Sequence, residues 1–129
     1  MQRALVTGGK GFIGSHLYNK LSQKGWDVLG IDLPEWDVTN KETWKLVLLS
    51  SRPDYIFHLV GYLDKYYQGE DEADFSKYLD VNTKSVALMF EVIVENKLPI
   101  KKVIVASSQS VYGEGDYQFD KPLEEWEDD

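Results

Sequence analysis

Residues 4–17 read ALVTGGKGFIGSHL, and this stretch decides the fold. A short apolar run, typical of a buried strand, stops at glycines. Apolar residues then recur four apart at Ile13, Leu17 and Leu21, which is helical spacing. The stretch therefore predicts a strand, a tight turn and a helix.

Three glycines of this turn follow the spacing G-x-x-G-x-x-G, which is wider than the commoner dinucleotide fingerprint G-x-G-x-x-G. We expect Gly8 to allow the sharp exit from the strand and Gly11 to let a pyrophosphate approach the backbone. Gly14 lets the helix pack closely on the sheet. The N–H groups that open the helix then face the phosphates. The alternative is an ordinary glycine-rich loop.

A second predicted strand, residues 27–31, ends at Asp32. This acid lies close to the offset of about 20 residues expected for an acceptor of ribose hydroxyls, which supports cofactor binding. No arginine follows Asp32 to receive a 2′-phosphate, so the sequence favours NAD over NADP. Lys10, inside the glycine turn, is the argument for NADP.

The composition is that of one soluble domain: 129 residues, 43% hydrophobic and 28% charged. We find no run of 18 apolar residues and no signal peptide, and we expect a cytoplasmic protein that does not bind membranes. The chain has no cysteine, and its two histidines are far apart in sequence, so we predict no disulfide and no metal site. Of the net charge of −8, residues 114–129 hold eight acids and one lysine, an acidic tail, and no basic stripe for nucleic acid is present.

The rest of the chain alternates helices and strands. Thr39 and Glu42 form a capping box that predicts a helix over residues 41–51. A strand over 55–60, a long helix over 74–96 and a strand over 103–106 follow. This order predicts an α/β fold with a doubly wound, Rossmann-type parallel sheet, whose ligands sit beyond the carboxyl ends of the strands.

Asn82 falls inside the apolar stripe of the predicted long helix, where a buried amide needs hydrogen-bond partners. Two interpretations stay open. Asn82 either binds a neighbouring backbone or braces the cofactor site.

These residues resemble the extended short-chain dehydrogenase/reductase family, the NAD-dependent epimerase/dehydratase group that acts on nucleotide sugars. Five local patterns match in order, and the ordered set is specific. They are residues 7–14, Asp32, residues 37–38, residues 58–61 and residues 107–113.

The resemblance implies roles at the adenosine end of NAD. Phe12 and Ile13 would lie along the pyrophosphate, and Asp32 would accept the adenosine ribose hydroxyls. Asp37 and Val38 would contact the adenine.

It also implies roles at the nicotinamide end. Leu59, Val60 and Gly61 would line that side through their backbones, although an alanine is common at the last position. Ser107 would lie near the nicotinamide. Ser108 matches the catalytic serine that hydrogen-bonds the reacting sugar hydroxyl.

The family also uses a tyrosine and a lysine in Y-x-x-x-K, and by resemblance this tyrosine falls beyond Asp129. Tyr117 and Lys121 fit the letters, but Tyr117 follows Ser108 by only nine residues, and Pro122 disfavours helical geometry at Lys121. We therefore expect an NAD-binding domain over residues 1–113 and an acidic tail over 114–129 that leads toward a missing catalytic region.

The expected function is the amino-terminal, NAD-binding portion of a nucleotide-sugar epimerase or dehydratase, inactive as this chain and with a possible homodimer through residues 74–96. The alternatives are a non-catalytic NAD(P)-binding sensor or partner-docking protein and an NADP-dependent nucleotide-sugar reductase.

Overall fold

A computed structural model describes residues 1–63, 69 and 74–112. Its elements follow in chain order: β1 (Arg3–Thr7), α1 (Phe12–Gln23), β2 (Asp27–Ile31), α2 (Lys41–Ser51), β3 (Tyr55–His58), the π-helical segment η2 (Tyr78–Lys84), α3 (Ser85–Glu95), β4 (Lys102–Val105) and the 3₁₀ turn η3 (Gln109–Tyr112).

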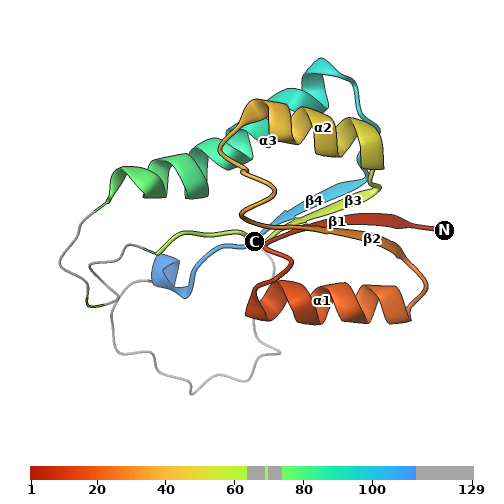
Figure 1. Cartoon of the computed structure of the whole chain (residues 1–129), viewed down its shortest axis with the longest axis horizontal. Helices are drawn as coiled ribbons and strands as arrows, with labels where there is room; N and C mark the ends of the chain where they lie inside the picture. The colour runs from red at the N-terminus through yellow and green to blue at the C-terminus, as the bar shows by residue number, and fades with distance from the viewer. Residues whose placement is uncertain (64–68, 70–73, 113–129) are drawn as a thin grey trace, which may run out of the picture.

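The strands form a parallel sheet of order β2-β1-β3-β4, in which β1 pairs with both β2 and β3. Figure 1 shows α2 and α3 over one face of the sheet and α1 over the other. The predicted doubly wound α/β architecture is therefore confirmed. Because all four strands are parallel, their carboxyl ends lie along one edge of the sheet.

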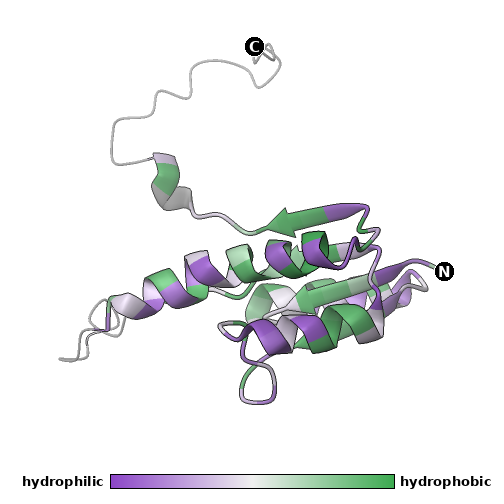
Figure 2. Ribbon diagram, turned by 90° about the horizontal axis from the view of Figure 1, so that it is seen from above, coloured by the Kyte–Doolittle hydropathy of each residue, from purple (hydrophilic) through white to green (hydrophobic). Residues whose placement is uncertain are grey.

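Two apolar layers hold the sheet between the helices. The larger layer packs Leu5 and Ile56 of the sheet against Trp44 of α2 and Met89 of α3, all fully buried. The smaller layer lies under α1 and includes Leu21. In Figure 2 the strands are mostly hydrophobic, whereas hydrophilic residues recur along the helices. The larger layer holds the sheet and thereby positions the edge that carries the candidate site.

Helix α2 has the predicted bounds but a different cap. Asn40, not Thr39, occupies the N-cap position, and its side-chain oxygen accepts a hydrogen bond from the Glu42 amide at 2.9 Å. The Thr39 hydroxyl instead donates to Asp37 Oδ1 at 2.7 Å. The predicted capping box is wrong because the Asp37 carboxylate, two residues away, accepts the hydrogen bond of the Thr39 hydroxyl.

The helix predicted over 74–96 is not one regular α-helix, since η2 precedes α3. A π turn holds more residues than an α turn, so the 3.6-residue repeat loses its phase across it. Phe75 and Leu79, expected in the buried stripe, are accordingly 56% and 68% exposed, and Phe90 is 43% exposed. Asn82 is exposed as well.

A smaller correction concerns the length of a strand. The strand predicted over residues 55–60 ends at His58, which frees the following backbone to turn along the rim. Among residues 1–63, 69 and 74–112, none of the helices has both the length and the hydrophobicity needed to cross a bilayer.

Candidate dinucleotide site

The glycine turn between β1 and α1 is tightly packed. Gly8 has a φ of +70°, a conformation that favours glycine, and a Cβ on Gly14 would lie 2.0 Å from the Gly8 carbonyl oxygen. A Cβ on Gly8 would lie 3.1 Å from the Val60 nitrogen. The turn therefore packs against the start of α1 and against the exit of β3, with no room for a Cβ at Gly8 or Gly14. The close packing predicted for Gly14 is present, and its partner is the turn itself.

Among the residues that the structure describes, no side chain caps the amino-terminal end of α1. Its N-cap residue, Gly11, makes no side-chain hydrogen bond, and the first turn holds no acidic residue. Phe12 and Ile13 are 82% and 66% exposed at this end. The first N–H groups of a helix have no partner within the helix and lie at the positive end of its dipole. The residues present therefore fit a phosphate group.

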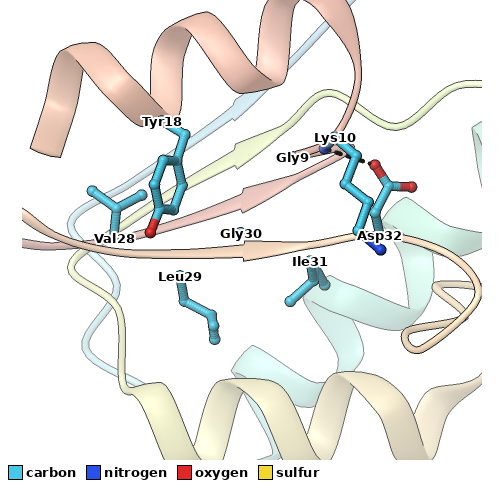
Figure 3. A pocket seen from close by; sticks show the side chains of 8 residues that line it. All are labelled: Gly9, Lys10, Tyr18, Val28, Leu29, Gly30, Ile31 and Asp32. Carbon is cyan, nitrogen blue, oxygen red and sulfur yellow. Dashed lines mark hydrogen bonds between the residues drawn. The ribbon is translucent and has the colours of Figure 1, made fainter.

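Asp32 lies beside the same turn. Its Oδ2 accepts a hydrogen bond from the Lys10 amide at 2.9 Å, and its Oδ1 accepts one from the Leu33 amide at 2.9 Å (Figure 3). Each carboxylate oxygen has a second lone pair, so the carboxylate remains able to accept hydroxyl groups. The end of β2 and the glycine turn are thus joined through the acid that the sequence singled out.

The Lys10 side chain leaves this turn toward Glu35. Its ammonium lies 2.9 Å from Glu35 Oε2 and 3.4 Å from the Leu33 carbonyl oxygen. The hydrogen bond from Lys10 lowers the pKa of the Glu35 carboxyl, and a backbone hydrogen bond acts in the same direction. Neither the pair nor its role was predicted from the sequence.

A small hollow of about 40 Å³ lies between the turn and the residues that precede α2. Five residues singled out by the sequence line it: Gly8, Asp32, Asp37, Val38 and Val60. Sequence reasoning missed three of its other residues, which are Trp36, Thr39 and Val81. The structure thus brings the predicted ribose and adenine residues together.

Asn82 joins η2 to the exit of β3. Its Oδ1 accepts a hydrogen bond from the Tyr62 amide at 2.7 Å, and its Nδ2 donates to the Tyr62 carbonyl oxygen at 2.9 Å. A Cβ on Gly61 would lie 3.8 Å from the same Oδ1. The interpretation that Asn82 binds a neighbouring backbone is confirmed, and the backbone it holds continues directly from residues 59–61.

A buried chain of hydrogen bonds lies under this rim. His58, 2% exposed, places Nδ1 2.9 Å from Thr7 Oγ1 and Nε2 3.1 Å from Ser85 Oγ. The Ser85 hydroxyl donates to the Val81 carbonyl, so its oxygen is left to accept from His58 Nε2–H. Nδ1 is then the acceptor, and the Thr7 hydroxyl donates to it.

The other end of this chain reaches the rim. Thr7 Oγ1 also accepts hydrogen bonds from the Leu59 amide at 3.1 Å and the Val60 amide at 3.3 Å. Burial lowers the pKa of His58 from 6.5 to about 4, which keeps the imidazole neutral. His58 is therefore a hydrogen-bonded histidine of the core. Sequence reasoning missed Ser85, because its contact with His58 joins residues 27 positions apart.

The two candidate serines follow β4. Ser107 and Ser108 are exposed, and the Ser108 carbonyl accepts a hydrogen bond from the Val111 amide at 3.2 Å. Parallel pairing of β3 with β4 places them on the same edge of the sheet as residues 59–61. Tyr117, Lys121 and the acidic tail lie outside the described residues.

Fold and turn together define a doubly wound α/β domain with a glycine-rich turn at its first helix, the class that binds dinucleotides. The chain belongs to the NAD dependent epimerase/dehydratase family, whose model matches residues 4–128.

Individual relatives agree with this family. A dTDP-L-rhamnose 4-epimerase from Burkholderia thailandensis is 25% identical over 91% of this chain and 37% of its own length. Among solved structures, a UDP-glucose 4-epimerase from Thermotoga maritima with UDP-glucose has a TM-score of 0.75 at 25% identity, covering 94% of this chain and 43% of that one. A UDP-glucose 4-epimerase from Bifidobacterium longum in complex with NAD⁺ and UDP has a TM-score of 0.72 at 26% identity, covering 87% and 38%. The chain thus spans about two fifths of the length of these relatives.

Proposed function

We propose that this chain binds NAD along the rim formed by the carboxyl ends of its strands. One observation supports this most strongly: Asp32 accepts a hydrogen bond from the amide of Lys10, inside the turn that leads into the uncapped helix α1. This contact brings a ribose acceptor next to a phosphate-binding helix end, which is the arrangement a dinucleotide requires. NAD is favoured over NADP because Asp32 adds a negative charge where a 2′-phosphate would lie.

The other candidate residues take the roles that the family resemblance implies. The adenine would lie against Asp37 and Val38, and the nicotinamide end along residues 59–61 and Ser107. Asn82 would hold that backbone in place through its two hydrogen bonds to Tyr62.

We extend the proposal to a full-length member of this family that would contain this domain. That protein would transfer hydride between NAD and a ring carbon of a nucleotide sugar, and Ser108 would hydrogen-bond the reacting hydroxyl. The Thermotoga relative with UDP-glucose supports this substrate class. This chain, which spans about two fifths of such relatives, would bind the cofactor without turnover.

Two further parts of the proposal concern surroundings. The helical segment over residues 74–96 would form a homodimer interface, and the exposed Leu79, Phe90 and Val94 on it support this. We place the protein in the cytoplasm, in keeping with a cysteine-free sequence that forms no disulfide.

The decisive experiment is calorimetric titration of NAD into the wild-type chain and two variants. Gly11 has φ −71° and ψ 171°, which valine also adopts, but a Cβ there would lie 3.1 Å from the Gly8 carbonyl oxygen. Urea unfolding therefore first checks that Gly11→Val retains the fold, and its side chain would then fill the phosphate position. We expect no NAD binding by Gly11→Val and a loss of roughly 1.5–3 kcal/mol for Asp32→Ala. Glu42→Gln, on the outer surface of α2, is the control and should bind as the wild type does. Wild-type affinity in Gly11→Val would contradict the placement of the site.

A second candidate is a sensor or partner-docking protein that binds the cofactor and catalyses nothing. Pro122 disfavours helical geometry at Lys121, which argues against Tyr117 and Lys121 as the family's catalytic pair and favours this candidate. The two candidates differ in the behaviour of the isolated chain. A sensor should melt cooperatively and remain monodisperse in light scattering. A portion of a larger enzyme should instead self-associate through the outer edge of β4, which pairs with β3 alone in the described part of the chain.

A further inference from the structure

Lys10 forms two kinds of contact with the residues that directly follow β2. Its backbone amide binds Asp32, whereas its side-chain ammonium binds Glu35 and the Leu33 carbonyl. The ammonium thus lies in an ion pair with Glu35, and no ion pair joins it to Asp32 within the described part of the chain. Lys10 therefore connects Asp32, the proposed ribose acceptor, to a second carboxylate, that of Glu35.

The surroundings of Asp32 give this pair a chemical meaning. A hollow of about 330 Å³ runs along the outer edge of β2, and Asp32 and Lys10 line one end of it while Tyr18 lines the other (Figure 3). Lys10 supplies the single positive charge among the residues that line this hollow. If a ribose diol binds Asp32, as the proposed function requires, a phosphate on the 2′-oxygen would be within the influence of Lys10 and Glu35.

The two charges of the pair act on such a phosphate in opposite directions. A phosphate monoester carries between one and two negative charges at neutral pH, so it attracts an ammonium and repels a carboxylate. The side chains of Lys10 and Glu35 are 64% and 59% exposed, and an ion pair this exposed is weak. Glu35 therefore does not lock the lysine permanently, but it neutralises the lysine and adds a repelling charge.

We propose that Glu35 is a specificity-determining residue of this site, which holds Lys10 in an ion pair and thereby selects a dinucleotide with a free 2′-hydroxyl. The inference rests on the proposed function, because it assumes that Asp32 binds the adenosine ribose. It assigns Lys10 a latent role: the ammonium becomes a phosphate ligand when the carboxylate is removed.

The test compares NAD and NADP affinities by calorimetry in the wild type, Glu35→Gln, the double variant Lys10→Gln/Glu35→Gln, and Glu42→Gln. Glu42 pairs with Lys45 on α2, is also exposed, and supplies the matched loss of one negative charge away from the hollow. We expect Glu35→Gln to raise the ratio of NADP to NAD affinity by about fivefold. The double variant should lose this gain, and Glu42→Gln should not show it. The gain should also shrink at high salt, because the groups are exposed.

Three results would overturn the inference while leaving NAD binding intact. They are an unchanged ratio in Glu35→Gln, a gain that persists in the double variant, and an equal gain in Glu42→Gln. Failure of the wild-type chain to bind either dinucleotide would instead refute the proposed function, and the inference with it.

Discussion

Acid should destabilise this protein through His58 in a defined pH range. The imidazole is 2% exposed, and its burial lowers the pKa from 6.5 to about 4. In the neutral form Nδ1 accepts a hydrogen bond from the Thr7 hydroxyl. Protonation turns Nδ1 into a donor that faces an oxygen already accepting two amide hydrogen bonds. The folded state therefore resists the charge that the unfolded chain accepts freely.

The sign and size follow from the two pKa values. Above pH 6.5 the imidazole is neutral in both states and contributes no pH dependence. Between pH 6.5 and pH 4 the unfolded state binds a proton that the folded state does not, so the free energy of unfolding falls as the pH falls. The loss attributed to His58 is about 2 kcal/mol at pH 5 and reaches roughly 3 kcal/mol below pH 4.

Urea unfolding measures this loss at about pH 7.5, which lies above the interval from 6.5 to 4, and at about pH 6 and about pH 5, which lie inside it. The chain holds 22 acidic residues that also titrate, so the comparison is with a variant rather than with a calculation. His58→Asn keeps an acceptor for the Thr7 hydroxyl but does not ionise. Between pH 7.5 and pH 5 its free energy of unfolding should therefore fall by about 2 kcal/mol less than that of the wild type. His16→Asn removes the other, exposed histidine and should retain the wild-type slope. An NMR titration of the His58 imidazole in the wild type gives an independent readout. Equal pH slopes for the wild type and His58→Asn would refute the reasoning.

Three further substitutions test the local geometry. Gly14→Ala would place a Cβ 2.0 Å from a backbone oxygen and should lower the free energy of unfolding by about 1–3 kcal/mol in urea melts. Gly61→Ala is the control, because its Cβ would meet its nearest atom at 3.8 Å, and it should leave the free energy of unfolding nearly unchanged. Asn40→Ala removes the cap of α2 and should cost about 1 kcal/mol, most of which Asn40→Asp should recover; equal losses would argue against the cap. Asn82→Ala removes the two hydrogen bonds between the Asn82 amide and the Tyr62 backbone, so hydrogen exchange of the Tyr62 amide should accelerate at least about fivefold; unchanged protection would contradict the clamp.

The glycine turn shows what local sequence can predict. The positive φ of Gly8 and the close contact of Gly14 follow from spacing alone, because no other residue type fits a turn this tight. Asp32 was found in the same way, since a parallel strand places its last residue at the edge of the sheet. The bounds of α2 were also predicted, although from a capping box at Thr39 that the structure replaces with Asn40.

The errors arose where local signals competed or where distant residues decide. Thr39 fits an N-cap on paper, but Asp37 takes its hydroxyl and Asn40 caps the helix instead. Periodicity did not reveal η2, because a π turn shifts the phase without changing the residue types. The partners of His58 lie 51 and 27 positions away in sequence, so only the assembled sheet and helix identify them.

The pairing pattern of the sheet also constrains how fast the chain acquires its structure. The first strand pairs Arg3 with Asp27 and Ala4 with Tyr55, and the third pairs Tyr55 with Lys102, so no ladder closes through a hairpin. Non-local pairing of this kind demands loop closure before any contact forms and slows the search for the native topology. During synthesis, β1 must wait for its central partner until nearly half of the 129 residues have emerged. In that interval its apolar side chains have no completed sheet to join, and this is when a nascent chain of this topology most needs protection from misassociation.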